Sequence, residues 1–122
     1  MRKILLVEDE DILRETFTLL MSTQPYEFET AENGQVALEL CQQQSFDLIL
    51  LDLMMPVLDG VGFLKQFEPI KPDATKVIVV SNLSSGIELD EAMKLGAERS
   101  VLKASLSPKE LLSLIRYELE AV

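Results

Sequence analysis

The sequence predicts an α/β fold, in which a doubly wound parallel sheet of five strands carries five helices on its two faces. Three uninterrupted apolar runs support this prediction, at residues 4–7, 48–51 and 77–80. Strands that are apolar on both sides are typical of parallel sheets covered by helices, because a strand exposed on one side alternates polar and apolar residues. Between the runs the apolar residues recur at helical spacing, which gives a repeated strand-helix order.

Two weaker strands are predicted at residues 26–30 and 100–102, where alternation or brevity places them nearer the sheet edges. A helix is predicted after each strand, because apolar side chains there share one helical face. In chain order these faces are Leu13, Phe17, Leu20 and Met21; Ala37, Leu38 and Cys41; Phe63, Leu64 and Phe67; Leu89, Ala92 and Met93; and Leu112, Ile115 and Leu119.

Several helix ends are also marked. Ser107, Pro108 and Glu110 give the last helix an N-cap, a first-turn proline and a capping-box glutamate. Pro69 is expected to end the third helix, and Gly96 to follow the fourth in a left-handed conformation. No Pro-, Gly- or Ser-rich linker interrupts the pattern, so residues 1–122 are predicted to form a single domain.

The composition argues against several functions. The 122 residues include 21 acidic and 11 basic side chains, and the formal net charge of -10 disfavours direct binding to nucleic acid or to an anionic membrane. Without histidine, the chain cannot use that residue in catalysis or as a zinc ligand. A single cysteine, and the lack of a signal peptide or a membrane-length apolar run, lead us to expect a cytoplasmic protein.

Polar side chains follow four of the five predicted strands. Glu8 and Asp9 follow the first strand, Asp52 the third, Ser81 the fourth and Lys103 the fifth. The carboxyl ends of parallel strands meet at one sheet edge, where open α/β folds bind ligands. Each residue alone has an ordinary explanation as a helix-terminus acid, a turn former, a cap or a surface lysine. Their coincidence at one edge predicts a site.

The chemistry of this site follows from its charges. Three carboxylates at one edge would repel one another and raise one another's pKa unless a hard divalent cation lies among them. Mg²⁺ is the predicted cofactor, because it binds carboxylate and carbonyl oxygens and leaves positions open for phosphate. Asp52 is then a candidate nucleophile that becomes an aspartyl phosphate. Lys103 would stabilise the charge of the phosphoryl group, and Ser81 would donate a hydrogen bond to it.

The pattern resembles the receiver domain of two-component response regulators over residues 3–120. The resemblance is carried by Glu8, Asp9, Ser81, Lys103 and the segment that contains Asp52, Met55, Pro56, Asp59 and Gly60. It implies a chemotaxis-regulator-like flavodoxin fold with strand order 2-1-3-4-5. It also implies phosphotransfer to Asp52 from a histidine kinase or a histidine phosphotransfer protein, in a signalling switch that is not a metabolic enzyme.

The resemblance also implies a role for each site residue. Asp9, Asp52 and the backbone carbonyl of Met54 would bind Mg²⁺, and Glu8 would assist mainly through water. Lys103 would pair with the phosphoryl group, and Ser81 would move toward it. That movement would alter the surface of the fourth helix, fifth strand and fifth helix, which would contact a downstream protein. Phosphorylation-dependent dimerisation is left open.

Several residues depart from the family pattern. Val101 stands where an aromatic switch residue is usual, and Asn82 stands where a small residue is usual, so that it would either bond to the phosphoryl group or crowd its entrance. Ala104 replaces a proline, and a trans peptide is predicted before it. Met54 and Leu83 are bulky and apolar at positions that flank the path of the hydrolytic water, which predicts slow self-dephosphorylation.

Other functions fit less well. A phosphohydrolase of the haloacid dehalogenase type would need a second aspartate at the position of Met54, together with a cap domain. FMN binding would need a hydroxyl- or glycine-rich loop where residues 8–11 are acidic. The main alternative is a phosphorylation-independent pseudo-receiver, which is an interaction module that keeps the fold without the switch. The departures at Val101 and Asn82 leave this alternative open. The intact acids and Lys103 favour the phosphorylated switch.

Overall fold

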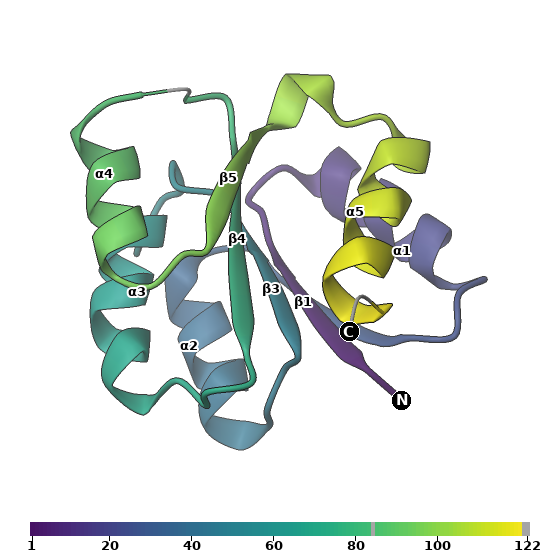
Figure 1. Cartoon of the computed structure of the whole chain (residues 1–122), viewed down its shortest axis with the longest axis horizontal. Helices are drawn as coiled ribbons and strands as arrows, with labels where there is room; N and C mark the ends of the chain where they lie inside the picture. The colour runs from purple at the N-terminus through teal and green to yellow at the C-terminus, as the bar shows by residue number, and fades with distance from the viewer. Residues whose placement is uncertain (84, 121–122) are drawn as a thin grey trace.

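The computed structural model describes residues 1–83 and 85–120. Five strands alternate with five helices in the predicted order (Figure 1). Their bounds are β1 Lys3–Val7, α1 Asp11–Met21, β2 Glu27–Ala31, α2 Gly34–Gln43, β3 Leu48–Leu51, α3 Gly60–Phe67, β4 Lys76–Ser81, α4 Ile87–Lys94, β5 Arg99–Leu102 and α5 Pro108–Glu120. Two single-turn 3-10 helices, η1 (Glu68–Ile70) and η2 (Lys103–Ser105), follow α3 and β5.

The strands form one parallel sheet in the order β2-β1-β3-β4-β5, which confirms the predicted topology. Helices α1 and α5 cover one face of the sheet, and α2, α3 and α4 cover the other (Figure 1). The central strands β1 and β3 are therefore sandwiched between helices, as their unbroken apolar runs require. The register pairs Val7 with Leu51 and Ser81 with Leu102, so these strand ends lie at the same sheet edge.

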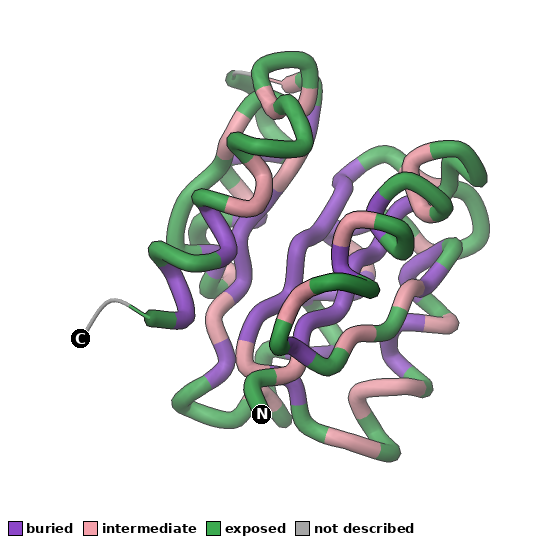
Figure 2. The backbone as a smooth tube through the Cα atoms, turned by 90° about the vertical axis from the view of Figure 1, so that its right-hand side faces the viewer, coloured by how far each residue is buried: buried purple, intermediate pink, exposed green. Residues whose placement is uncertain are grey.

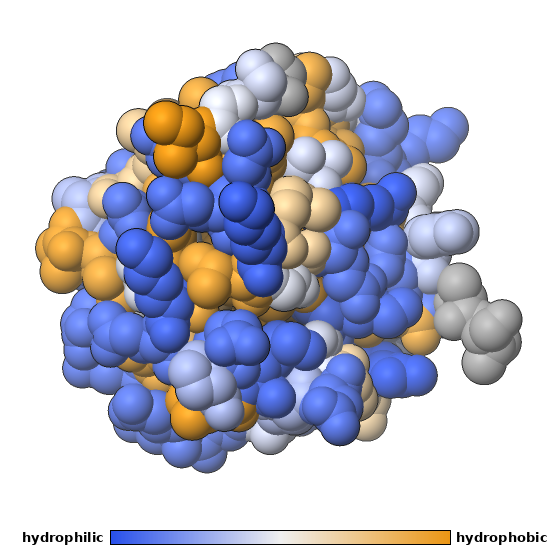
Figure 3. Space-filling view, turned by 60° about the vertical axis from the view of Figure 1, so that its left-hand side comes forward, coloured by the Kyte–Doolittle hydropathy of each residue, from blue (hydrophilic) through white to orange (hydrophobic). Residues whose placement is uncertain are grey.

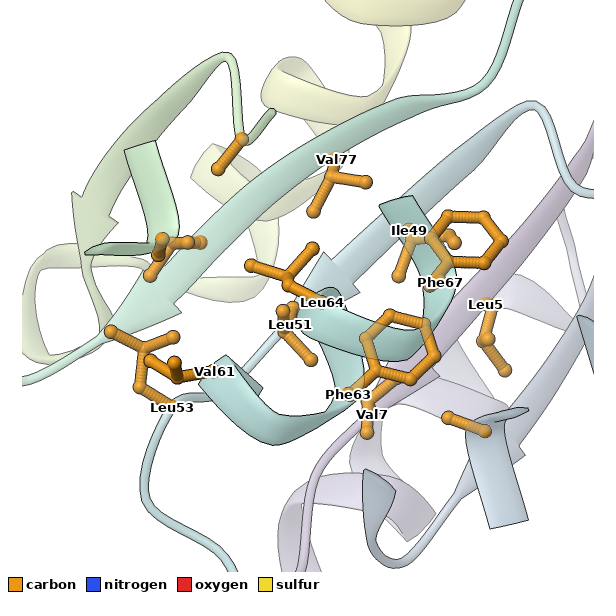
Figure 4. Close-up of a cluster of buried hydrophobic side chains, with 14 of the residues drawn as sticks. Leu5, Val7, Ile49, Leu51, Leu53, Val61, Phe63, Leu64, Phe67 and Val77 are labelled. Atoms are coloured by element: carbon orange, nitrogen blue, oxygen red, sulfur yellow. The ribbon is translucent and has the colours of Figure 1, made fainter. Parts of the chain in front are cut away.

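The core consists of two hydrophobic clusters, one on each face of the sheet. Buried positions concentrate in the central strands and on the inward sides of the helices (Figure 2). On the α3 side, the stacked rings of Phe63 and Phe67 pack with Leu64 over Leu51 and Ile49 (Figure 4). Each such side chain contributes about 1.5–3 kcal/mol on full burial, which fixes the sheet as a rigid platform for its edge loops.

The Ser107 N-cap and the ends of the third and fourth helices agree with the prediction. Ser107 Oγ accepts a hydrogen bond from Glu110 N–H (3.2 Å) at the start of α5. Helix α3 ends at Phe67, and the chain tightens into η1 at Pro69. Gly96 has a φ of 107°, the left-handed conformation expected after α4.

Two details of the predicted helix faces are wrong. Met93 is 38% exposed, because it lies about 100° around α4 from the buried Ala92 and this short helix buries only a narrow stripe. On α5 the buried stripe includes Leu114 in place of Leu112. It also contains Glu118, whose carboxylate pairs with Arg99 at 3.1 Å.

The surface is mixed in character. The side of the molecule that carries α4 is largely hydrophilic, with hydrophobic side chains scattered between polar ones (Figure 3). Within residues 1–83 and 85–120, no helix combines the length and the apolar character needed to cross a membrane.

Candidate functional site

The residues singled out at the strand ends lie together at the carboxyl edge of the sheet. Glu8 and Asp52 directly follow β1 and β3, Ser81 is the last residue of β4, and Lys103 directly follows β5. Most of these side chains line one depression of about 220 Å³, which is surrounded by Asp9, Glu10, Asp52, Met54, Ser81, Asn82, Leu83 and Lys103. Glu8 lies beside it, in contact with Lys103.

Lys103 connects the acids of two strands. Its Nζ lies 3.0 Å from Asp52 Oδ2 and 2.8 Å from Glu8 Oε1, and Glu10 Oε1 is at 4.0 Å. Burial alone would lower the pKa of Lys103, but its hydrogen bonds to Glu8 and Asp52 outweigh burial and raise it. The lysine therefore carries a fixed positive charge beside Asp52 in the lining of the depression.

Glu8 is a buried acid held in place by the backbone. Only 4% of its surface is exposed, and its Oε2 accepts a hydrogen bond from Glu10 N–H at 3.1 Å. Burial raises the pKa of Glu8, with a smaller contribution from the negative charge of Asp52, and the hydrogen bond from Lys103 opposes both. The larger cause is therefore loss of hydration, whereas the sequence predicts mutual repulsion between the carboxylates.

Asp52 is buried at the base of the depression, with 6% of its surface exposed. Its N–H donates to Val7 O (3.1 Å), which ties it to the end of β1, and its Oδ1 accepts a long bond from Met54 N–H (3.4 Å). The chain then turns back toward the site. A Cβ at Gly60 would lie 2.6 Å from the backbone oxygen of Asp52, so only glycine permits this close approach.

The turn between Asp52 and Gly60 contains one strained position. Val57 has a φ of 69°, in the left-handed region that β-branched residues disfavour, and the residue is 81% exposed. Asp59 ends the turn by accepting a hydrogen bond from Gly62 N–H (2.8 Å) as the N-cap of α3. Met54, at the rim, is 59% exposed.

The carboxylates of Glu8, Asp9 and Asp52 fit a divalent cation. Each offers an oxygen, and these oxygens all lie within 4.8 Å of one another. With the ammonium of Lys103, the three carboxylates leave a formal excess of two negative charges. Oxygen ligands with that excess match the preference of a hard cation such as Mg²⁺. Asp9 is the exposed member, so the open side of the set faces solvent.

The loop after β4 carries the remaining predicted residues near the site. Ser81 is 1% exposed, and its Oγ accepts a hydrogen bond from Leu83 N–H (3.2 Å). Asn82 Oδ1 accepts a hydrogen bond from Ala104 N–H (3.2 Å). The described residues contain no cis peptide bond, so the prediction of a trans peptide before Ala104 is confirmed. Val101 lies apart from the depression, half-buried against the cluster beneath α1 and α5.

Two residues near the site were missed by the sequence analysis. Glu10 lines the depression, and Arg14 donates from its guanidinium to the backbone oxygen of Glu8 (2.7 Å). Arg14 also pairs with the exposed Asp11. The spacing of three residues between Asp11 and Arg14 on a helix was a usable signal for the pair, but nothing in the sequence indicated the contact with Glu8.

The geometry defines a site at the sheet edge with buried acids, one lysine and a nearby hydroxyl. Comparison with known proteins identifies the family to which the chain belongs. A family model described as the response regulator receiver domain matches residues 4–116. The chain therefore belongs to the response regulator receiver domain family of two-component systems, which confirms the resemblance seen in the sequence.

Individual relatives are similar over nearly the whole chain. The probable transcriptional regulator ycf27 of Cyanophora paradoxa is 36% identical over 115 residues, which cover 94% of this chain and 47% of that protein. SrrA of Staphylococcus aureus, a transcriptional regulatory protein, is 30% identical over 93% of this chain and 46% of its own length. The chain thus spans less than half the length of these curated relatives.

A solved structure matches in fold and length. The chemotaxis protein CheY4 of Vibrio cholerae has 29% sequence identity and a TM-score of 0.85, and the match covers 98% of this chain and 99% of that one. The flavodoxin-like arrangement predicted from the sequence is confirmed by this likeness and by the strand order.

Proposed function

We propose that this domain is a phosphoryl-accepting signalling switch, in which Asp52 receives a phosphoryl group from a histidine kinase or a histidine phosphotransfer protein with the help of Mg²⁺. The observation that carries the proposal is the position of Lys103 Nζ, 3.0 Å from a carboxylate that is buried at the base of an open depression. A nucleophile and a fixed positive charge are thereby held at the place where phosphoryl charge would develop.

The transfer is an exchange of one bond to phosphorus for another. A carboxylate oxygen of Asp52 attacks the phosphorus, a P–O bond forms, and the P–N bond to the donor imidazole breaks, so that the imidazole nitrogen leaves with the bonding electron pair. Asp9, Asp52 and the backbone carbonyl of Met54 would hold Mg²⁺, with Glu8 assisting mainly through water, and the bound ion would neutralise phosphoryl oxygens during this exchange. Lys103 keeps its contact with the reacting group, since it is already paired with Asp52.

Ser81 is proposed to respond to phosphorylation of Asp52. In the structure its hydroxyl oxygen accepts from Leu83 N–H, and a new bond to a phosphoryl oxygen would draw the hydroxyl and its loop toward Asp52. Val101 is the residue that would respond in the place of an aromatic switch residue. Because the valine side chain is smaller than an aromatic ring and already half-buried, its rotation would change fewer contacts.

Met54 and Leu83 are proposed to slow hydrolysis of the aspartyl phosphate. Met54 lines the rim with a largely exposed side chain, and Leu83 packs partly against the core beside the same depression. Bulky apolar groups there restrict and dehydrate the path of an attacking water. The variants Met54→Asn and Leu83→Lys are expected to shorten the phosphate lifetime several-fold, and an unchanged lifetime in both would contradict this role.

The proposed setting is cytoplasmic signalling through protein partners. Receiver domains are signalling modules, and the two curated relatives named above are described as transcriptional regulators. For this domain we propose a kinase or phosphotransfer protein as donor and a downstream protein as target. Its net charge of -10 disfavours direct contact with nucleic acid or an anionic membrane. Dimerisation on phosphorylation is a further proposed outcome.

Intact mass tests this function. Wild type and Asp52→Asn are incubated with acetyl phosphate, in Mg²⁺ and in a chelator. One phosphoryl adduct on wild type, dependent on Mg²⁺ and lost in Asp52→Asn, is the expected result. If no adduct forms under any condition, and calorimetry detects no Mg²⁺ binding, the chain is a phosphorylation-independent interaction module.

A further inference from the structure

The loops that follow β4 and β5 are joined by one side chain. Asn82, directly after Ser81, accepts a hydrogen bond through Oδ1 from the backbone N–H of Ala104, directly after Lys103 (3.2 Å). The bond therefore lies one residue beyond both groups that the proposed phosphoryl group would contact. Both partners are exposed, and Asn82 lines the depression.

This bond needs both residues. Proline has no backbone N–H, so a chain with proline at position 104 could not donate here. A small side chain at position 82 could not reach across as an acceptor. The two departures seen in the sequence thus complement each other, because Ala104 supplies the donor and Asn82 supplies the acceptor.

The same loop is closed by a second contact. Ser81 Oγ accepts from Leu83 N–H (3.2 Å), so the three residues from Ser81 to Leu83 are held by one bond within the loop and one bond to the neighbouring loop. If Ser81 turns toward a phosphoryl group on Asp52, its bond from Leu83 must break. Asn82 is the next residue in the chain and moves with it.

We propose that the Asn82–Ala104 hydrogen bond is a latch that holds the loop after β4 in its unphosphorylated conformation and opens when Ser81 engages a phosphoryl group. This inference rests on the proposed function and adds a regulatory residue to it. Asn82 acts here as a positioning residue, through the loop and not by touching the phosphoryl group.

The expected effect is modest, because the bond is exposed to water. One such hydrogen bond shifts an equilibrium by about two- to tenfold. Removing the latch therefore raises the affinity for a phosphoryl analogue by about that factor, because less free energy is needed to open the loop. The alternatives from the sequence analysis give other results: loss of a direct bond to the phosphoryl group would lower the affinity, and relief of crowding would raise it whether or not Ala104 can donate.

Calorimetric titration with beryllium trifluoride and Mg²⁺ separates these cases. Asn82→Ala is compared with wild type, and Ser105→Ala, which alters an exposed side chain in η2, is the matched control. The same Asn82→Ala change is then made in an Ala104→Pro background. If the bond is a latch, Asn82→Ala binds the analogue about two- to tenfold more tightly than wild type, and Ser105→Ala binds it as wild type does. In the Ala104→Pro background, which lacks the N–H donor, Asn82→Ala has no effect on the affinity.

The Ala104 amide signal in NMR reports the bond itself, and the comparison of wild type with Asn82→Ala needs no metal. Its proton is expected to move upfield and to exchange faster in Asn82→Ala, and in wild type on binding the analogue. If the affinity does not rise, if it rises equally in both backgrounds, or if the amide stays bonded in the complex, the latch is wrong. If wild type binds no analogue at all, the proposed function fails and the latch fails with it.

Discussion

Replacing Lys103 by methionine removes the positive charge that two buried acids share. Glu8 and Asp52 side chains are only 5% and 7% exposed, and Lys103 Nζ is within 3.0 Å of both. Removing one partner of a buried ion pair costs about 3–5 kcal/mol. The lysine side chain keeps 17% exposure, so we expect the lower end, a loss of about 3 kcal/mol in the free energy of unfolding.

Urea unfolding of the metal-free protein at pH 7 measures this loss. With a slope of about 1.5 kcal/mol per molar urea, the midpoint of Lys103→Met falls by about 2 M. Lys65→Met is the matched control, because Lys65 pairs with Glu91 at 3.7 Å on the surface, where a pair contributes at most about 1 kcal/mol. Equal losses in the two variants would refute the electrostatic account of the site.

The decrease in the free energy of unfolding caused by Lys103→Met also depends on pH and on bound metal. Without Lys103 the pKa of Glu8 rises further, since the lysine hydrogen bond holds it down. Above the native pKa of Glu8, the ionised carboxylate then lowers the free energy of unfolding of the variant. The difference in this free energy between wild type and Lys103→Met therefore becomes smaller as the pH falls and the acid is protonated. Saturating Mg²⁺ should stabilise the variant more than wild type, because a cation replaces the missing charge.

Three other measurements test the loops and the core. Val57→Asn should raise the free energy of unfolding by about 1 kcal/mol, because asparagine tolerates the left-handed backbone at φ 69° and the exposed valine loses no packing; an unchanged urea midpoint would contradict the strain. Gly60→Ala should cost at least about 2 kcal/mol, since its Cβ would meet backbone atoms at 2.6–2.7 Å, whereas Gly62→Ala should cost less because the Leu58 side chain it meets can move. Burial raises the pKa of Cys41 from 9.0 to about 12, so iodoacetamide at pH 8 should react with the native thiol at least about tenfold more slowly than with the urea-unfolded chain, and equal rates would contradict the burial.

The fold was predictable because its strongest signals are local. The apolar runs of the central strands can be buried only inside a parallel sheet covered on both faces, and β3 begins and ends where the sequence predicts it. The edge strand β2 lies at residues 27–31, one residue later than predicted, since its alternating pattern fixes the ends less firmly.

The placement of the acids and the lysine was also predictable, because parallel strands deliver their carboxyl ends to one edge. Finer contacts depend on tertiary distances that no spacing encodes. Glu118 is buried on α5 beside Arg99, although a glutamate in a sequence indicates a solvated position. The hydrogen bond from Ala104 to Asn82 joins residues 22 positions apart. Every alanine has a backbone N–H and every asparagine has a side-chain oxygen, so the sequence alone does not indicate that these two groups meet.

Asp52, and not the exposed Asp9 or Asp59, is the proposed acceptor of the phosphoryl group. Reduction with borohydride after incubation with acetyl phosphate and Mg²⁺ converts an aspartyl phosphate to homoserine, which peptide mass spectrometry locates. We expect homoserine at position 52 alone, and none when the metal is chelated. Homoserine at another aspartate, or an unmodified Asp52 in Mg²⁺, would contradict it.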